Sequence, residues 1–369
     1  MKKRMYMYVY NDITTDARVQ RAANALADDF ELTLISTQKG KTIQDTKYKN
    51  VLVGGNRGKL NVFSHIFSAL RIIRKANPEV VYCHDYYSSI LAYLLIKINY
   101  RGMLIYDAHE LIIPEKGNRD RRQSFFYWFE KRIVHKVHLL VCASVERGLL
   151  MEDHYGLTKE PLVIPNISQL QINDTDKDVE AVLESLKEFF FIPKLTVVYA
   201  GAVTSSRRID ELLRAVYKLH HKCKLLIVGN GDAFDRLKRE AASYTGFDYA
   251  FTGSVPYKCL GSILHRCDIG FLYYPMNTLN NIYCASNKIY EYASVGLPML
   301  SNENPTVEKI LEKYEIGIST VDFTNGLVAV IEDIEVYKKN CDSFTENNQW
   351  TEQAERLKQT ITTLLTSSK

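Results

Sequence analysis

The segment CASNKIYEYASVGLPML contains residues whose types and spacing suit the binding of a phosphorylated ligand. Ser286 is a candidate N-cap, and Asn287 and Lys288 follow it in the first turn of the helix that the segment predicts. Free backbone N–H groups at a helix start bind phosphate, and the Lys288 ammonium adds positive charge. Glu291 lies one turn farther along, where it can accept hydrogen bonds from sugar hydroxyls. An ordinary capped helix with a solvated glutamate explains the same pattern, so the segment alone does not decide.

Two adjacent arginines mark a second candidate site for phosphate groups. In VVYAGAVTSSRRIDELLRAV, an apolar strand is followed by Gly201 and Ala202, a loop rich in Ser and Thr, and then Arg207 and Arg208 at a helix start. Small residues let a diphosphate approach the backbone, and guanidinium groups bind phosphate oxygens. Cations at a helix N-terminus oppose the helix dipole, so a bound anion would relieve an unfavourable arrangement of charge.

Glycines follow two other predicted strands in the second half of the chain. Gly229 and Gly231 lie in LLIVGNGDAFDRL, which matches half of a G-x-G-x-x-G fingerprint but has Phe234 at the third glycine position. Tight turns alone explain these two glycines, and the fingerprint is absent from the first strand turn, so a nicotinamide oxidoreductase is disfavoured. Gly253 ends the run YAFTG, and the backbone around Val255 is placed to face a base.

The first half of the chain places polar side chains after its predicted strands. His109 and Glu110 follow the run LIYDA, and a histidine there can bind a sugar or phosphate oxygen or take part in proton transfer. Asp12, Asp16 and Arg18 follow the first predicted strand, where an acceptor or a diphosphate could bind. A structural histidine and ordinary surface caps are the competing interpretations of these positions.

The elements that must position these residues alternate regularly. Short apolar runs rich in strand-forming residues are separated by helical patterns, which predicts βαβ units and parallel sheets covered by helices. We expect a first domain over residues 1–168, a linker over 169–193 and a second domain over 194–349, with a helix over about 350–369 docked back on the first domain. The predicted fold class is α/β, with two facing Rossmann-like doubly wound domains and a deep cleft between them, because ligands bind beyond the carboxyl ends of parallel strands.

Composition excludes several classes of protein. The chain has 369 residues, of which 46% are hydrophobic and 24% charged, so it is neither a disordered chain nor a small disulfide scaffold. Seven cysteines without a C-x-x-C pair predict reduced, buried thiols and no zinc ribbon. The apolar run Ile90–Ile96 is too short to span a bilayer, and the chain start predicts a buried strand rather than a signal peptide, so we expect a cytoplasmic protein. The net charge is +4, with a basic first half and an acidic second half.

The segment RDRRQSFFYWFEKRIVHK is a candidate membrane contact. Its five consecutive aromatic residues, 125–129, lie between the basic residues Arg119, Arg121, Arg122, Lys131, Arg132 and Lys136. An interfacial helix on anionic lipid has this composition, which would make the protein peripheral on the inner membrane face. A core helix is the favoured interpretation, because consecutive aromatic residues point all around a helix.

Together, these motifs resemble the retaining, nucleotide-sugar-dependent glycosyltransferases of GT-B architecture, in particular family four, also called glycosyl transferases group 1. The resemblance covers most of the chain and is carried by the order of TDARVQRAANAL, YDAHEL, VCASVERGLL, VIPN, AGAVTSSRRIDELLRAV, LLIVGNGD, FTGSV, CDIGFLYYP and SNKIYEYASVGLP. It implies transfer of a sugar from a nucleoside diphosphate sugar to a saccharide or lipid-linked saccharide, in polysaccharide or glycoconjugate synthesis. It also implies a donor-binding second domain, an acceptor-binding first domain, no required cofactor, no metal and no nucleic acid partner.

The resemblance assigns roles to individual residues. It places Glu291 on the ribose hydroxyls, Arg207 on the diphosphate and His109 near the transferred sugar, and these three are the predicted catalytic residues. The predicted donor site comprises Gly201, Arg207, Arg208, Gly229, Gly231, Gly253, Val255, Asn287, Lys288 and Glu291, and the predicted acceptor site comprises Asp12, Asp16, Arg18, His109 and Glu110.

Two positions depart from the family pattern. Tyr283 occupies a position where the family often has a sugar-binding glutamate, and Ala202 one where it often has an arginine. The motif Asp174-Thr175-Asp176 lies in the predicted linker and is not expected to bind a metal. No carboxylate pair suits double displacement, and the family implies front-face attack. A nucleotide-sugar epimerase and a catalytically weak nucleotide-sugar-binding scaffold are the alternatives.

Overall fold

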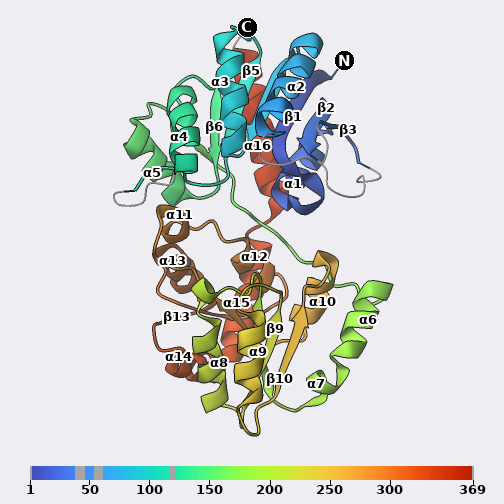
Figure 1. Ribbon diagram of the computed structural model, residues 1–369, viewed down its shortest axis with the longest axis vertical. Coiled ribbons are helices and arrows are strands. Elements are labelled where there is room, and N and C mark those ends of the chain that lie inside the picture. The colour runs from blue at the N-terminus through green and yellow to red at the C-terminus, as the bar shows by residue number, and fades with distance from the viewer. Residues whose placement is uncertain (1, 38–45, 54–60, 116–120, 368–369) are drawn as a thin grey trace. The chain divides into compact units, whose positions relative to one another are not determined.

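The computed structural model describes residues 2–37, 46–53, 61–115 and 121–367 (Figure 1). The chain forms two compact units. One comprises residues 1–165 together with 350–369, and the other comprises residues 166–349. The closing segment, for which the sequence predicts a helix, therefore belongs to the first unit, and the last two residues of that predicted helix lie outside the described ranges.

A seven-stranded parallel sheet forms the centre of the first unit, in the order β3-β2-β1-β4-β5-β6-β7. Its strands are β1 (Lys3–Asp12), β2 (Phe30–Thr37), β3 (Lys49–Leu52), β4 (Val80–His84), β5 (Met103–Ala108), β6 (Leu139–Cys142) and β7 (Leu162–Val163). The central strands are buried on both faces, which explains their continuous apolar runs. Strand order reverses between β1 and β4, and in a doubly wound sheet ligands bind beyond the strand ends at such a reversal.

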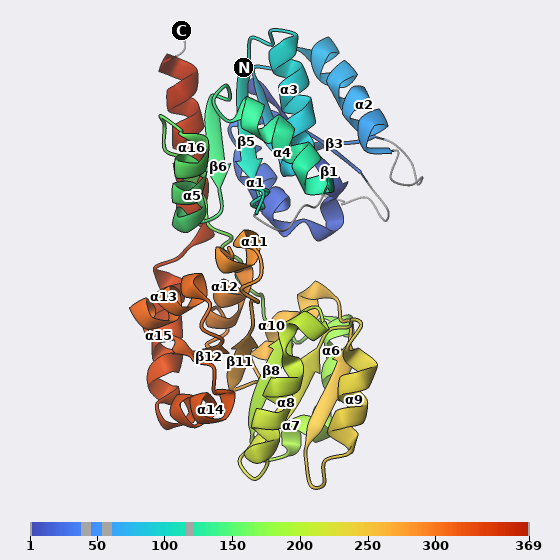
Figure 2. The same ribbon diagram turned by 60° about the vertical axis from the view of Figure 1, so that its left-hand side comes forward.

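Helices cover both faces of this sheet. On one face, α1 (Ala17–Leu26) packs against α16 (Trp350–Ser367), whose Leu357 and Ile361 join strand residues such as Met5 and Met7 in one buried cluster. On the other, α2 (Asn61–Ala76), α3 (Ser89–Lys97) and α4 (Arg121–Ile133) lie side by side (Figure 2). Helix α5 (Val145–Tyr155) connects β6 to β7. The apolar stripe of α16 thus faces the first unit's core.

The second unit is built on a six-stranded parallel sheet in the order β10-β9-β8-β11-β12-β13. Its strands are β8 (Leu195–Ala200), β9 (Cys223–Val228), β10 (Tyr249–Gly253), β11 (Ile269–Leu272), β12 (Met299–Ser301) and β13 (Gly317–Ser319). Strand order reverses between β8 and β11, so the loops after these two strands flank the expected ligand-binding edge.

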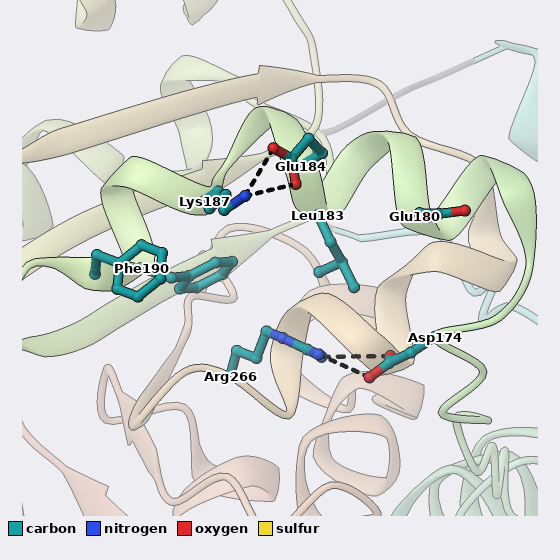
Figure 3. A pocket seen from close by; sticks show the side chains of 8 residues that line it. Asp174, Glu180, Leu183, Glu184, Lys187, Phe190 and Arg266 are labelled. Atoms are coloured by element: carbon teal, nitrogen blue, oxygen red, sulfur yellow. Dashed lines mark hydrogen bonds and ion pairs between the residues drawn. The ribbon is translucent and has the colours of Figure 1, made fainter.

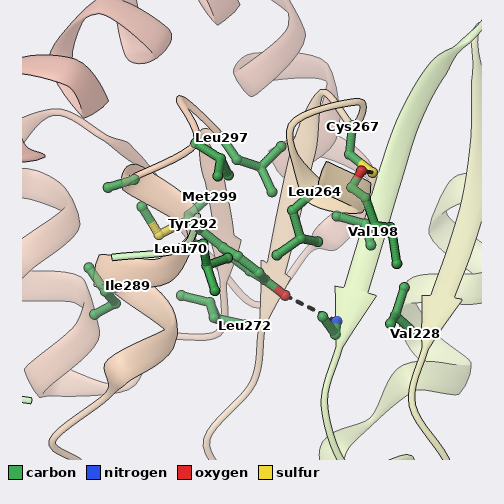
Figure 4. Close-up of a cluster of buried hydrophobic side chains, with 14 of the residues drawn as sticks. Leu170, Val198, Val228, Leu264, Cys267, Leu272, Ile289, Tyr292, Leu297 and Met299 are labelled. Carbon is green, nitrogen blue, oxygen red and sulfur yellow. Dashed lines mark hydrogen bonds between the residues drawn. The ribbon is translucent and has the colours of Figure 1, made fainter. Parts of the chain in front are cut away.

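Two buried clusters fill the faces of this second sheet. One contains side chains of α8 (Ile209–Lys218), α9 (Phe234–Ala242) and α14 (Phe323–Glu332). The other, part of which is drawn in Figure 4, contains side chains of α6 (Lys177–Ser185), α7 (Lys187–Phe191), α10 (Leu260–Leu264), α12 (Asn287–Ala293), α13 (Pro305–Tyr314) and α15 (Ile334–Glu346). The short α11 (Leu279–Ile282) precedes α12. All seven cysteines are buried free thiols, as the sequence predicts.

Tyr292 ties α12 to the end of β8. It is fully buried in the second cluster, and its hydroxyl accepts a hydrogen bond of 3.1 Å from the backbone nitrogen of Ala200 (Figure 4). Gly270 in β11 makes room for its ring, since a Cβ at that position would lie 2.5 Å from a ring carbon. The residues that begin α12 are thereby held beside the loop that starts at Gly201.

Tyr292→Phe should reduce the free energy of unfolding by about 1–3 kcal/mol, because the buried Ala200 N–H would lose its acceptor. Denaturant unfolding of the full chain measures the change. Tyr314→Phe removes a hydroxyl from a partly buried ring that packs against Phe344, and serves as the control. Equal changes for the two variants would mean that the hydrogen bond to Ala200 contributes little.

The segment 169–193 forms part of the second unit rather than a free linker. It carries α6 and α7, whose Val179 and Phe189 belong to the same buried cluster as Tyr292. In β9, the Lys224 ammonium donates hydrogen bonds of 2.7 Å to the carbonyl oxygens of Phe189 and Ile192, which fixes the end of α7. The polar sequence arises because the outer faces of these two helices are exposed.

A hollow of about 350 Å³ lies beside α6 and α7 (Figure 3). In its wall, Asp174 accepts a hydrogen bond of 2.7 Å from Arg266. Outside the hollow, Asp176 lies 2.8 Å from the Lys258 ammonium. Each aspartate of the Asp174-Thr175-Asp176 motif is therefore paired with a basic side chain.

None of the helices in the described ranges is long and apolar enough to cross a membrane.

Candidate active site

A cavity of about 180 Å³ lies where the strand order of the second sheet reverses. The ends of β8 and β11 and the start of α12 form its walls. Its lining residues are Tyr199, Ala200, Gly201, Ala202, Arg207, Phe271, Leu272, Tyr273, Tyr274, Asn287 and Lys288. Four residues of the predicted donor site, drawn from two distant segments, thus line one cavity: Gly201, Arg207, Asn287 and Lys288.

Arg207 is held in this cavity by the tyrosines that follow β11. It ends a short 3₁₀ turn, Ser205–Arg207, and its Nη1 donates a hydrogen bond of 2.6 Å to the carbonyl oxygen of Tyr273. The guanidinium carbon lies 5.0 Å from the centre of the Tyr274 ring, within cation–π distance. Tyr274 is itself fixed by a hydrogen bond of 2.7 Å from its hydroxyl to Ser286 Oγ. The guanidinium is thus pre-oriented before any ligand binds.

Arg208 has a different environment. Its backbone is left-handed, with φ of 49°, and its exposed side chain pairs with Glu211 of α8. It is not among the residues that line the cavity. Of the two adjacent arginines, Arg207 is therefore the one placed to bind a ligand there.

Glu291 lies beside the cavity and is almost completely buried. Its Oε2 accepts a hydrogen bond of 2.6 Å from the Lys288 ammonium, and its Oε1 accepts bonds of 3.0 Å from the Tyr257 hydroxyl and 3.4 Å from Asn287 Nδ2. Ser286 caps α12, as the sequence predicts. The glutamate is therefore hydrogen-bonded to its neighbours rather than solvated.

The predicted glycines support the cavity rather than line it, apart from Gly201. A Cβ at Gly229 would lie 1.9 Å from the carbonyl oxygen of Gly201, and one at Gly231 would lie 2.3 Å from that of Val203. The nitrogen of Gly229 donates a hydrogen bond of 2.9 Å to the carbonyl oxygen of Gly253. Close backbone packing therefore explains glycine at positions 229 and 231, whereas Gly253 has open space around it and a φ of 70°, which favours glycine.

The first unit contains a buried polar network centred on Asp107 of β5. Its Oδ1 accepts a hydrogen bond of 2.9 Å from Arg18, and its Oδ2 accepts one of 3.2 Å from the Tyr82 hydroxyl. Oδ2 also lies 3.5 Å from Nδ1 of His84 and 3.6 Å from Nε2 of His109, and these two ring nitrogens are 3.3 Å apart.

Burial and charge act in opposite directions on this network. Burial alone would raise the pKa of Asp107, but the Arg18 guanidinium, the charge on His109 and hydrogen bonds from both histidines together hold that pKa well below its ordinary value. Burial would lower the pKa of His109, yet Asp107 raises it above the ordinary value. The pKa of His84 is lowered, chiefly by burial. His109 is therefore the more readily protonated of the two histidines.

The side chains of His84, Asp107 and His109 could serve as metal ligands, since their ligand atoms lie 3.3 to 3.6 Å apart. Asp107, however, is already neutralised by the buried guanidinium of Arg18. A divalent cation would add uncompensated positive charge in a buried position, which is unfavourable. We therefore interpret the group as a hydrogen-bonded network.

Sequence models of two families match the chain. The model described as Glycosyltransferase Family 4 matches residues 17–167, and that described as Glycosyl transferases group 1 matches residues 184–363. The chain belongs to the family four, group 1 glycosyltransferases. None of the curated proteins compared with it matches significantly.

Solved structures share the fold of this glycosyltransferase. A sucrose-phosphate synthase from Thermosynechococcus elongatus has a TM-score of 0.76 at 12% identity, covering 99% of this chain and 100% of that one. Anabaena HepE in complex with UDP-glucose has a TM-score of 0.75 at 11% identity, covering 98% and 100%. WaaG, involved in lipopolysaccharide biosynthesis, has a TM-score of 0.69 at 11% identity, covering 96% and 98%. The predicted α/β class, with two doubly wound parallel-sheet domains of GT-B type, is confirmed.

The predicted acceptor residues of the glycosyltransferase have varied environments. Asp12 caps the 3₁₀ turn Ile13–Thr15, and Asp16 caps α1. Arg18 is buried, with its guanidinium bonded to Asp107 and to the carbonyl oxygen of Ile164 at 2.9 Å, so it orients Asp107 rather than facing a ligand. Glu110 is exposed after β5.

Three other positions singled out in the sequence of this glycosyltransferase have different environments in the second unit. Val255 packs, partly buried, against the core of this unit. Ala202 lines the cavity, and its carbonyl oxygen accepts a hydrogen bond of 2.7 Å from the Tyr199 hydroxyl. Tyr283 is the C-cap of α11.

The sequence does not indicate Asp85 as a candidate functional residue of this glycosyltransferase. It follows β4 with φ of 65° and ψ of 163°, a conformation that is strained for any residue except glycine. Burial raises the pKa of Asp85 to about 6. Its Oδ1 accepts a hydrogen bond of 2.7 Å from the Tyr86 nitrogen. A strained acid at the carboxyl edge of the sheet is typical of functional sites, but nothing in the run VVYCHDYY indicates the strain.

Proposed function

We propose that this glycosyltransferase transfers a sugar, with retention of anomeric configuration, from a nucleoside diphosphate sugar to a saccharide or lipid-linked saccharide. The observation that carries the proposal is the placement of Arg207 and Lys288 in one cavity at the reversal of the second sheet, with Glu291 bonded to Lys288. Two cations match a diphosphate, and a carboxylate matches ribose hydroxyls. Uridine diphosphate is the first nucleotide to test, because HepE was solved with UDP and with UDP-glucose.

The chemical difficulty of the reaction is the departure of a nucleoside diphosphate. Negative charge accumulates on the leaving phosphate oxygen as the bond from the sugar to that oxygen breaks. Arg207 and Lys288 stabilise this charge electrostatically. The acceptor hydroxyl oxygen forms the new bond on the same face of the sugar, and the departing phosphate takes its proton. We assign His109, whose pKa Asp107 raises, to hydrogen bonding with the transferred sugar or the acceptor.

A panel of nucleoside diphosphate sugars tests this proposal. Binding and slow hydrolysis are measured with the wild-type chain and with Glu291→Ala. Tight binding that depends on Glu291, with release of nucleoside diphosphate, supports the transferase and identifies the donor. An isomerised sugar would indicate an epimerase, and binding without hydrolysis or transfer to any acceptor would indicate a scaffold. Failure to bind any member would overturn the assignment of the donor site.

We further propose that the first unit contacts an anionic membrane surface on the cytoplasmic side, where a lipid-linked acceptor would be found. Helix α4 exposes Phe125 and Trp128, while Phe126 is buried, so its aromatic run is divided between core and surface. Helix α2 exposes Phe63 and Phe67, and the Phe63 and Phe125 rings are 6.1 Å apart. We call these four exposed rings the aromatic patch.

The charges around the aromatic patch are basic. Arg71 and Arg74 continue the exposed face of α2, which contains no acidic residue. On α4, Arg132 stacks on Trp128, while the acid of that helix, Glu130, is buried and accepts hydrogen bonds from two tyrosines. Exposed aromatic rings flanked by arginines are typical of helices that lie in the membrane interface. Arg119 lies outside the described residues.

Arg121→Glu combined with Arg122→Glu should weaken binding to vesicles containing phosphatidylserine by at least about tenfold, because both charges near the lipid are reversed. Co-sedimentation with the vesicles measures the binding. Arg236→Glu combined with Arg239→Glu makes the same charge change in α9 of the second unit and should have little effect. Unchanged binding of the first pair, or no binding by the wild-type chain, would contradict the proposed membrane contact.

A further inference from the structure

The Glu291 carboxylate is covered by its own hydrogen-bond partners. Glu291 is 1% exposed, whereas the Lys288 side chain is 21% exposed and Tyr257 is 50% exposed. The Lys288 ammonium occupies Oε2 at 2.6 Å, and the Tyr257 hydroxyl occupies Oε1 at 3.0 Å. A pair of ribose hydroxyls therefore cannot reach the carboxylate until one of these side chains moves.

A bound phosphate would draw the Lys288 ammonium away from the Glu291 carboxylate. Lys288 lines the same cavity as Arg207, whose guanidinium is fixed on the carbonyl oxygen of Tyr273. A diphosphate bound by Arg207 would share this cavity with the ammonium, and its charges exceed that of one carboxylate. A lysine ammonium sits on a flexible four-carbon stem and can turn from one anion to another while the helix backbone stays in place.

Tyr257 does not respond to phosphate in the same way. Its hydroxyl is neutral and also lies 2.8 Å from Ser168 Oγ. A phosphate therefore has far less electrostatic attraction for Tyr257 than for the Lys288 ammonium. Lys288 and Tyr257 thus differ in how strongly a diphosphate attracts them away from Glu291.

We propose that the Lys288–Glu291 ion pair is a latch that couples recognition of the donor's diphosphate to recognition of its ribose. The inference rests on the proposed function and specifies how that site selects its ligand. When the diphosphate draws Lys288 away, the exposed carboxylate oxygen needs new hydrogen-bond donors, and the ribose hydroxyls supply them. A nucleoside without phosphates does not draw Lys288 away, so the Glu291 carboxylate stays covered and cannot bind its ribose hydroxyls. Pyrophosphate without a ribose opens the latch but leaves the Glu291 carboxylate underpaired.

The latch predicts changes that two independent contacts would not produce. Lys288→Met uncovers Glu291, so it should bind uridine about fivefold more tightly than the wild-type chain while binding UDP more weakly. Glu291→Gln frees the ammonium, so it should bind inorganic pyrophosphate about fivefold more tightly while also binding UDP more weakly. If the contacts were independent, Lys288→Met would leave uridine affinity unchanged.

The experiment titrates the full chain with uridine, inorganic pyrophosphate and UDP, using calorimetry for UDP and saturation-transfer NMR for the weaker ligands. Lys238→Met on the exposed face of α9 is the control for loss of a lysine. Lys288→Ala uncovers Glu291 with a smaller side chain and should reproduce the gain for uridine if Lys288→Met is unstable. The double variant Lys288→Met, Glu291→Gln separates the latch from long-range charge, because Glu291→Gln should give no gain for pyrophosphate once the lysine is absent.

The outcomes distinguish the latch from the donor site itself. The latch is supported if Lys288→Met binds uridine more tightly and Glu291→Gln binds pyrophosphate more tightly than the wild-type chain. Neither increase in affinity should occur in the control or in the double variant. If UDP binds and depends on Arg207 but Lys288→Met and Lys288→Ala show no gain for uridine, the latch is overturned and the proposed function stands. If no nucleoside diphosphate binds the wild-type chain, both are overturned.

Discussion

Arg207→Met should lower kcat/KM for glycosyl transfer by about 100-fold or more, whereas Arg208→Met should lower it less than about threefold. The reason is position. Arg207 lines the cavity and is oriented by the Tyr273 carbonyl oxygen and the Tyr274 ring, so its charge is available to a leaving diphosphate without reorganisation. Arg208 is exposed and paired with Glu211.

The kcat/KM of the two variants is obtained from initial rates over a range of donor concentrations. The acceptor concentration is fixed, or water serves as the acceptor where none is known. The two substitutions remove the same charge from neighbouring positions, so the ratio of their effects reports location rather than net charge. Equal losses in the two variants would contradict the assignment of Arg207 to the leaving group. A loss confined to Arg208→Met would place the phosphate outside the cavity.

The central parts of both sheets follow directly from the sequence. Runs such as VVYCH and CKLLIV are continuous because central parallel strands are buried on both faces, and this makes them recognisable. The strands β3, β7 and β13 lie at sheet edges and are short, with partly exposed residues, so their sequences carry too weak a pattern to be predicted. The helices of 169–193 have polar outer faces, and for this reason the sequence predicts a linker there.

The sequence predicts which residue types lie at the candidate site, but not how their side chains are oriented or paired. Residue type and position after a strand identify Arg207, Lys288 and Glu291, because the edge of a parallel sheet gathers whatever follows its strands. Which of two adjacent arginines faces the cavity depends on the backbone angle of Arg208, and that angle has no signature in the letters RR. The pairing of Arg18 with Asp107 joins positions far apart in the chain, so no local pattern indicates it.

Asp107→Asn should reduce the free energy of unfolding by about 3–5 kcal/mol near neutral pH, because it leaves the buried Arg18 guanidinium without its counter-charge. Asp28→Asn, which removes an exposed partner of Lys47, should reduce the free energy of unfolding far less, because solvent screens that pair. Urea unfolding of the full chain at several pH values measures both. The lowered pKa of Asp107 means that its stabilisation is present above the ordinary carboxyl pKa and is lost as the pH falls through the lowered value. The gap between wild type and variant should therefore narrow only in strong acid.

The same substitution should also change the titration of His109. Because Asp107 raises the pKa of His109, the stabilisation of its charged form is complete below the ordinary histidine pKa and is lost as the pH rises through the raised value. In Asp107→Asn the His109 pKa should fall, and any limb of the pH–rate profile that depends on protonated His109 should move to lower pH. NMR titration of the histidine ring protons follows this directly. A His109 pKa that does not change in Asp107→Asn would show that the carboxylate acts on packing alone, and the assignment of protonated His109 to the sugar or acceptor would lose its electrostatic basis.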